Sequence, residues 1–366
     1  MGQAPRTDTT SRPPTAPSPR TDSPHLPTAR PPHVGHPRPT TKAVRAGRAG
    51  QQSRPKAWWR QILLAAATVA ALTAAAHPEI PAPAPATLSP PTAATLASTY
   101  EANRANAGQA ARMAAAHGDT HRAAADRTLA AANLLGFDGR GAGRATEVLG
   151  DLLHADRIAV LVPGSDTSLD TYTRFHRTAA ALYKDLGHRT RNGTRTAVVA
   201  WLGYPTPGTV STTVTTATRA DRAAPRLRSL VRELRTLAPT RARISVLCHS
   251  YGSVVCGRAA PGLDVDGMVL LGSPGTGADT VAGLHTRARV WAARGSRDWV
   301  AHVPHIRADL LITTVGFGTD PVSRAFGASV FEAAGADHSG YFTPGSVSLA
   351  NLSRITLGET SEVTRG

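Results

Sequence analysis

The sequence predicts an α/β protein built on a mostly parallel, doubly wound sheet. From residue 157 onward, short apolar segments alternate with longer amphipathic ones, and parallel strands require such helical crossovers between them. The apolar segments, such as residues 157–162 and 244–247, are nearly continuous runs rich in valine, isoleucine and leucine. This composition is typical of strands that are buried on both faces of a sheet.

The positive charge of the chain is concentrated at its N-terminus. The formal net charge is +16, and residues 1–60 contain 11 of the 41 Lys and Arg residues but only two acidic residues, Asp8 and Asp22. The remainder is only mildly basic, which argues against a specific nucleic-acid-binding core. Residues 1–55 are rich in Pro, Thr, Ser, Arg and Gly, and they predict a disordered basic tail that touches anionic lipid or nucleic acid at most without specificity.

Residues 56–76 predict a membrane anchor or a signal segment. The sequence KAWWR at residues 56–60 precedes an uncharged, alanine-rich run at residues 61–76. Basic residues and tryptophans at the edge of an apolar run are typical of a membrane segment whose preceding tail is inside. A membrane span needs about 20 residues, and this run is shorter. A retained anchor, a cleaved signal peptide and a soluble helix therefore all stay open. An anchor or a signal would place the following domain outside the cell membrane, attached or secreted.

Two further segments precede the predicted sheet. Residues 77–91 are rich in proline and alanine and predict an extended linker. Residues 92–140 are alanine-rich and predict a helical appendage of two helices that break near Gly118 and Asp119. A turn-rich connection at residues 137–141 would then lead into the α/β domain, residues 141–366.

Within residues 141–366 the alternation predicts six strands. We expect them at residues 157–162, 195–202, 244–247, 267–271, 288–293 and 329–333. Helices are expected at residues 172–186 and 220–237, from residue 253 onward, and at residues 345–357. Ligands in such sheets gather beyond the carboxyl ends of the strands, so the loops that follow the strands are where a site should lie.

The stretch at residues 248–252, Cys-His-Ser-Tyr-Gly, lies between a predicted strand and a small-residue helix. It is similar to the nucleophile elbow of α/β-hydrolases, G-x-S-x-G, in which a sharp turn exposes the serine oxygen. Such a turn needs small residues two positions before and after the serine. Gly252 meets this requirement, and Cys248 stands where glycine is usual. The stretch therefore predicts Ser250 as a nucleophile.

A serine nucleophile needs a hydrogen-bonded base, and the base needs an acid that orients it. His338 follows the last predicted strand, and Asp298 follows the strand at residues 288–293. The resulting chain order of serine, aspartate and histidine is the order expected for this fold. Asp320 and Asp337 are the rival acids, but the first lies in a turn and the second adjoins the histidine too closely to orient it.

An oxyanion hole needs two N–H donors aimed at the developing charge. The N–H of Tyr251, which follows the nucleophile, is one candidate. The loop after the first core strand supplies Gly164, which allows close backbone approach, and Ser165 as the second donor. Two histidines, His302 and His305, are expected to be ordinary loop residues, although they could line the pocket.

His249 is expected to point away from the site, as the second residue of such a motif usually does. The two cysteines, Cys248 and Cys256, lie on a strand end and its following helix. A disulfide needs Cα atoms within about 7 Å of each other, which we do not expect for this spacing. No metal site is suggested by the cysteines, and acyl transfer on serine requires no metal or organic cofactor. The glycines at residues 272–277 have the spacing of a phosphate-binding loop but lack its lysine.

Taken together, these motifs resemble an actinobacterial α/β-hydrolase family long catalogued as a domain of unknown function. The resemblance covers roughly residues 92–358. It rests on VPGSDTSLD at residues 162–170, WLGYPTP at 201–207, CHSYG at 248–252, LLGSPG at 270–275 and DHSGY at 337–341. It implies the α/β-hydrolase fold and the assignment of Ser250, Asp298 and His338 as a triad, and it names no substrate.

The leading hypothesis is a serine hydrolase that cleaves a carboxylic ester through an acyl-enzyme, in the class of carboxylesterases. The expected substrate is a small-molecule or lipid-like ester, and the expected membrane contact is through residues 61–76. An envelope acyltransferase with the same triad and an inactive hydrolase fold used as a binding module are the alternatives. The sequence does not determine the acyl group, the alcohol or the oligomeric state.

Overall fold

The computed structural model describes residues 80–190, 193–208, 217–302, 308–310, 313–315 and 317–366. The predicted basic tail, the apolar segment at residues 61–76 and the first residues of the Pro/Ala linker lie outside these ranges. All described residues belong to one compact unit, residues 75–366. None of the helices within them combines the length and apolar character that crossing a membrane requires.

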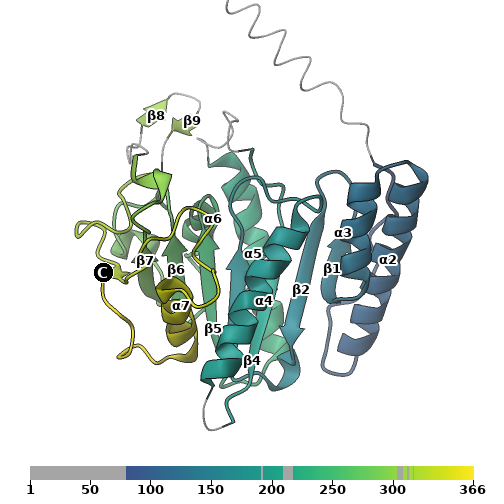
Figure 1. Ribbon diagram of the computed structural model, residues 1–366, viewed down its shortest axis with the longest axis horizontal. Coiled ribbons are helices and arrows are strands. Elements are labelled where there is room, and N and C mark those ends of the chain that lie inside the picture. The colour runs from purple at the N-terminus through teal and green to yellow at the C-terminus, as the bar shows by residue number, and fades with distance from the viewer. Residues whose placement is uncertain (1–79, 191–192, 209–216, 303–307, 311–312, 316) are drawn as a thin grey trace, which may run out of the picture. The chain divides into compact units, whose positions relative to one another are not determined.

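The described residues form an eight-stranded, mostly parallel sheet in the order β1-β2-β4-β3-β5-β6-β7-β10 (Figure 1), which confirms the predicted fold class. Its strands are β1 (Asn133–Asp138), β2 (Arg144–Gly150), β3 (Arg157–Val162), β4 (Thr196–Leu202), β5 (Arg243–His249), β6 (Gly267–Leu271), β7 (Arg289–Ala293) and β10 (Ser329–Val330). β2 runs opposite to the other seven strands of this sheet, so its pairings with β1 and β4 are antiparallel and the others are parallel.

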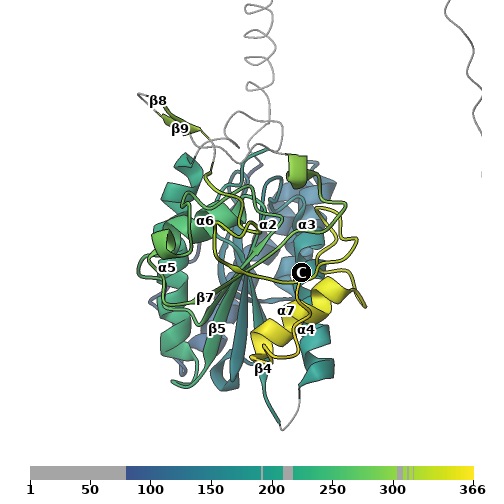
Figure 2. The same ribbon diagram turned by 90° about the vertical axis from the view of Figure 1, so that its left-hand side faces the viewer.

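Helices cover both faces of the sheet (Figure 2). α5 (Thr218–Leu237) and α6 (Gly252–Ala259) pack together on one face, and α4 (Tyr172–Arg189) and α7 (Val347–Leu357) pack together on the other. Each helix buries an apolar stripe against the sheet, as Leu227 and Leu234 of α5 illustrate. The inner strands are buried on both faces, and β3 and β6 have the bounds that their continuous apolar runs predict.

The expected number of strands was too low, because β1 and β2 were not predicted. β1 falls inside the alanine-rich stretch and β2 follows its turn-rich end, and both depend on pairing at the sheet edge. The two helices of that stretch, α2 (Leu96–Ala116) and α3 (Thr120–Ala130), pack on each other and α2 packs on β1. They break where expected, and the Asp119 carboxylate caps α3 by accepting from the Arg122 N–H.

The remaining elements are short. They are the 3₁₀ turns η1 (Leu152–His154), η3 (Ala282–Leu284) and η4 (Trp299–His302), and a separate two-stranded ribbon of β8 (Ala308–Leu310) and β9 (Thr313–Val315). Since β3, β5, β6, β7 and β10 are parallel, their carboxyl ends meet at one edge of the sheet. The turns that carry the predicted functional residues therefore come together there.

Candidate active site

Ser250 lies at a sharp turn between β5 and α6. Its φ is +52°, a left-handed conformation that costs a non-glycine residue about 1–2 kcal/mol. The Ser250 N–H donates to the carbonyl oxygen of Leu271 on the neighbouring strand, which holds the turn in place. Gly252 is required because a Cβ there would come within 2.5 Å of the Val162 carbonyl oxygen. A strained serine at a strand-to-helix turn is the geometry of a nucleophile elbow.

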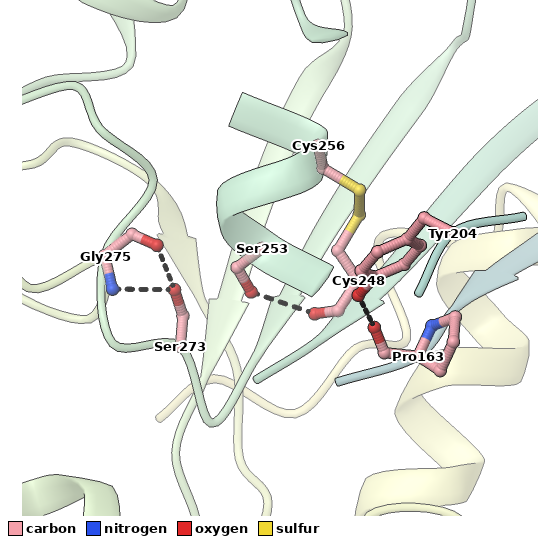
Figure 3. Close-up of a disulfide and its surroundings, with 7 residues drawn as sticks. All are labelled: Pro163, Tyr204, Cys248, Ser253, Cys256, Ser273 and Gly275. Atoms are coloured by element: carbon pink, nitrogen blue, oxygen red, sulfur yellow. Dashed lines mark hydrogen bonds between the residues drawn. A yellow bond between two sulfur atoms is a disulfide. The ribbon is translucent and has the colours of Figure 1, made fainter. Parts of the chain in front are cut away.

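The expectation that the two cysteines stay apart was wrong. Cys248 and Cys256 form a disulfide, with their Cα atoms 6.4 Å apart (Figure 3). The reason is the sharpness of the elbow, which turns the chain back so that the second turn of α6 lies beside the end of β5. Both cysteines are fully buried, and the Ser253 hydroxyl donates to the Cys248 carbonyl oxygen across the same turn. The elbow is thus closed by a covalent bond and a hydrogen bond.

The structure brings Ser250, His338 and Asp298 into a hydrogen-bonded chain. His338 Nε2 lies 2.9 Å from Ser250 Oγ, and His338 Nδ1 lies 2.9 Å from Asp298 Oδ1. The three residues come from the turns after β5, β10 and β7. Because an ionised carboxylate only accepts hydrogen bonds, Nδ1 carries a proton and Nε2 is left to accept from the serine hydroxyl.

Asp298 is held by more donors than His338 alone. The Val300 N–H donates to its Oδ1 at 2.9 Å, and the Tyr341 hydroxyl donates to its Oδ2. Burial would raise the pKa of this carboxyl, but the hydrogen bonds from His338, Tyr341 and Val300 outweigh burial and lower it below its ordinary value. Asp298 is therefore an anion that is fixed in orientation at neutral pH.

Two residues that the sequence analysis did not single out complete this corner of the site. Tyr341 is buried, and its hydroxyl also accepts from the Gly295 N–H at 3.2 Å. Gly272 at the end of β6 leaves the space that these groups occupy. A Cβ at this position, whose φ is +50°, would lie 2.4 Å from Asp298 Oδ2 and 3.1 Å from both His338 Nδ1 and Tyr341 Oη. The sequence signal that could have identified Tyr341 is its position three residues after His338.

His249 does not point away from the site as expected. Its Nε2 lies 2.6 Å from the main-chain oxygen of His338, and the two imidazole rings lie 4.7 Å apart. Since a carbonyl oxygen only accepts, Nε2 carries the proton. Burial and the neighbouring His338 lower the pKa of His249 to about 4, so it stays neutral. His249 therefore supports the backbone of the turn that carries His338.

Of the predicted oxyanion residues, Gly164 and Ser165 lie in the turn after β3, and Tyr251 directly follows Ser250. Gly164 is in close contact with it, since a Cβ at Gly164 would lie 2.6 Å from the Ser250 Cβ. Ser165 follows in the same turn and is partly exposed. Tyr251 has a buried side chain that stacks on the Tyr204 ring and accepts from the Ala220 N–H.

The rival residues are engaged elsewhere or lie outside the described ranges. Asp320 pairs with Arg294 at 2.5 Å, and the Asp337 carboxylate accepts from the Ser339 N–H within its own turn. His302 is exposed, and His305 lies outside the described residues. Trp299 was not singled out, yet this residue is 48% exposed, and its ring centroid lies 4.7 Å from that of His338. It thus offers an apolar surface on the open side of the histidine.

The glycine-rich segment after β6 has a defined local structure. After β6, the Ser273 hydroxyl donates to the Gly275 carbonyl oxygen and accepts from its N–H (Figure 3), so this segment is a tight turn. Among the described residues, no group of three or more His, Cys, Asp or Glu side chains is arranged to hold a metal ion.

Comparison with known proteins agrees with this architecture. A family model described as alpha/beta hydrolase matches residues 138–308. An uncharacterized protein of Mycobacterium tuberculosis, from strains CDC 1551 and H37Rv, is 30% identical over 253 residues, covering 60% of this chain and 37% of that protein. The chain therefore spans little more than a third of the length of these curated relatives.

Solved structures of hydrolases are similar to this chain at low identity. Esterase PE8 is 17% identical with a TM-score of 0.39, covering 58% of this chain and 97% of that chain. A serine hydrolase of Xanthomonas campestris, described as having no lid, is 13% identical with a TM-score of 0.38, covering 59% and 89%. Likeness at this distance carries no argument about substrate or activity.

Proposed function

The chain belongs to the α/β-hydrolase superfamily, and from this premise we propose that it is a serine hydrolase that cleaves a carboxylic ester through an acyl-enzyme on Ser250. The observation that carries the proposal is the hydrogen-bonded chain from Ser250 through His338 to Asp298, with the serine in a strained elbow. A helix-start serine with no chemical role would need neither the strain nor the histidine.

In the proposed reaction, Ser250 Oγ attacks the acyl carbon while His338 Nε2 accepts the hydroxyl proton. The imidazolium that forms is stabilised by Asp298, whose lowered pKa keeps it ionised. The proton then passes from Nε2 to the leaving alcohol oxygen, and the acyl group stays on Ser250. A water molecule repeats the sequence with His338 as its base, which releases the acid and restores the serine.

The negative charge of the tetrahedral intermediate needs donors near Ser250. We assign this role to the N–H groups of Tyr251 and Ser165, with Gly164 permitting the approach. The close packing of Gly164 on Ser250 supports the assignment, since it places the backbone of the β3 turn directly beside the nucleophile. Removing one such donor typically costs about 2.7–4 kcal/mol of transition-state stabilisation.

The surroundings of His338 favour an ester with an apolar part next to the reacting carbonyl. The half-exposed Trp299 ring packs against the His338 ring, where it would contact a bound substrate.

The test is labelling of the full chain with a fluorophosphonate, followed by intact mass and peptide mapping. We expect one adduct, on Ser250, because only an activated serine reacts with this probe at an appreciable rate. The adduct should be lost in Ser250→Ala and His338→Ala. Ser98→Ala, which removes an exposed helix hydroxyl, is the matched control and should label like the parent chain.

An ester panel of increasing acyl length, assayed with and without an added alcohol, then identifies the product. Free acid as the main product agrees with the proposal. A new ester formed with the added alcohol would show that the protein transfers the acyl group to an alcohol and does not hydrolyse the ester. A folded protein that takes up no fluorophosphonate would overturn the serine mechanism and favour a binding module.

A further inference from the structure

A cavity of about 760 Å³ opens beside the proposed site, at the same edge of the sheet. Its walls are the loop between β1 and β2, the residues that follow β4, and the first turns of α5. Five arginines and a single carboxylate line it; they are Arg140, Arg144, Arg219, Arg222, Arg226 and Asp138. The lining is therefore strongly positive, in a domain that is otherwise only mildly basic.

The one carboxylate is already saturated by two of the five arginines. Asp138 accepts from Arg140 Nε at 2.9 Å and from Arg144 Nη2 at 2.6 Å. Burial acts to raise the pKa of Asp138, but the two arginines hold it at about 2. It remains an anion under all ordinary conditions, and it neutralises only part of the charge of its own pair.

The other three arginines, Arg219, Arg222 and Arg226, lie on α5, and none of them forms an ion pair with a described carboxylate. Arg219 donates to the main-chain oxygens of Pro205 and Thr206, and Arg226 reaches the Gly203 oxygen at 3.4 Å. Arg222 has no hydrogen bond or ion pair to any described residue. A guanidinium carries five N–H donors, so most donors of these three groups make no hydrogen bond to the described residues. Burial and the charge of Arg144 lower the pKa of Arg226, as expected for crowded cations.

The cavity has rigid walls, which a binding site needs. Arg122 on α3 is buried and ties down the β1–β2 loop by donating to the main-chain oxygens of Gly139 and Gly141. Its guanidinium also pairs with Asp170 at 2.6 Å. The N-terminus of α5 lies in the wall at Thr218, and no side chain caps it. Its partial positive charge adds to that of the arginines.

The cavity and the nucleophile share a wall. Tyr204 lines the cavity, and its hydroxyl donates to the Pro163 carbonyl oxygen (Figure 3). Pro163 directly precedes Gly164, which packs on Ser250. The Tyr204 ring also stacks on Tyr251, the residue after the nucleophile.

We propose that the arginine cavity binds a phosphate group, and that this group is part of the ester that Ser250 cleaves. Arginine forks match phosphate oxygens with paired hydrogen bonds, and a phosphate carries the multiple charge that several unpaired guanidinium groups can neutralise. The binding of phosphate stands on the cavity alone. The link to the ester rests on the proposed function.

The first experiment measures binding of inorganic pyrophosphate to the full chain by titration calorimetry at low salt. Arg222→Gln/Arg226→Gln removes two exposed cavity charges, and we expect its Kd to rise at least about tenfold. The matched control is Arg232→Gln, an exposed arginine of the same helix that is not in the cavity lining. It removes charge elsewhere and should leave Kd within about twofold. Thermal melting checks that both variants fold.

Equal weakening in the double variant and in the control would assign pyrophosphate binding to general surface charge and overturn the proposal. Undetectable binding to the parent chain would overturn it as well. Competition by vesicles of an anionic phospholipid distinguishes the source of the phosphate. If glycerol phosphate displaces pyrophosphate and vesicles do not, the result agrees with a soluble phosphorylated ester. If vesicles displace pyrophosphate and glycerol phosphate does not, the result contradicts a soluble ester.

The second experiment compares hydrolysis of butyryl glycerol phosphate with that of butyryl glycerol. We expect the parent chain to prefer the phosphorylated ester by at least about tenfold in kcat/KM, and the double variant to lose this preference while it still cleaves butyryl glycerol. Cleavage of both esters without preference would refute the link to substrate. Cleavage of neither, with no fluorophosphonate adduct, would instead refute the proposed function and leave the binding result standing.

Discussion

The Tyr341 hydroxyl donates to Asp298 Oδ2, the carboxylate oxygen that His338 does not use. The carboxylate is therefore held from both sides, with the Val300 N–H as a third donor. Tyr341 in turn accepts from the Gly295 N–H, which fixes the phenol. The orientation of Asp298, and through it that of the imidazole, depends on this buried tyrosine.

Tyr341→Phe should lower kcat with little change in KM, since the hydroxyl acts on the proposed triad and not on the substrate. A hydrogen bond to a charged group is worth about 1.5–3 kcal/mol, which corresponds to a loss of roughly 10- to 100-fold. Steady-state kinetics on a chromogenic ester measure the effect. Tyr183→Phe, at a partly exposed tyrosine on α4, is the control, and an unchanged kcat in Tyr341→Phe would contradict the role.

Gly272→Ala should abolish most serine reactivity. The new Cβ would lie 2.4 Å from Asp298 Oδ2, so the carboxylate must move, and a displacement of about 1 Å at such a site costs about 100-fold. Gly327→Ala is a matched control, because Gly327 also has a positive φ, +85°, but has no atom within 4 Å of the added Cβ. The rate of fluorophosphonate labelling compares the two, and equal rates would show that Gly272 is not needed for space.

The disulfide should stabilise the fold. Replacing both cysteines in Cys248→Ala/Cys256→Ala keeps position 248 small, and the chain-entropy estimate for a loop of this size is a loss of about 2.5 kcal/mol. Urea unfolding of the parent chain should shift to lower urea in the presence of dithiothreitol, whereas the double variant should not respond to it. If the urea midpoint of the parent chain is the same with and without dithiothreitol, the disulfide does not stabilise the fold.

Asp126 makes stability fall as pH rises. It is buried, its Oδ1 has no hydrogen-bond partner among the described residues, and burial raises its pKa to about 7 despite the opposing charge of Arg122. Between the ordinary carboxyl pKa of about 4 and this value, the folded chain binds more protons than the unfolded chain, so the free energy of unfolding decreases with pH.

Asp126→Asn removes this dependence. Relative to the parent chain, the variant should gain stability as pH rises from about 4 to 8, by an amount on the order of a few kcal/mol at most. Urea unfolding at pH 5 and pH 8 measures the difference. Asp264→Asn, at a largely exposed aspartate, should show no such trend, and a constant difference for Asp126→Asn at both pH values would refute the explanation.

Patterns along the chain were sufficient for the inner part of the sheet. The apolar runs of β3 and β6 and the amphipathic period of α5 are local signals, because burial on both faces or on one helical stripe selects the residues directly. β1 and β2 escaped prediction since their stability comes from pairing with each other and with β4 at the sheet edge. The composition of the surrounding alanine-rich stretch does not indicate that these residues pair as strands.

The sequence by itself determined the α/β-hydrolase fold and placed a serine, an aspartate and a histidine each after a different strand, because strand and turn signals are short-range. Only the tertiary structure decided which distant groups meet: Tyr341 with Asp298, His249 with the His338 backbone, Cys248 with Cys256. These contacts depend on how sharply the elbow turns and on how parallel strands align their ends. Such distances come from packing, and they are not encoded in spacing along the chain.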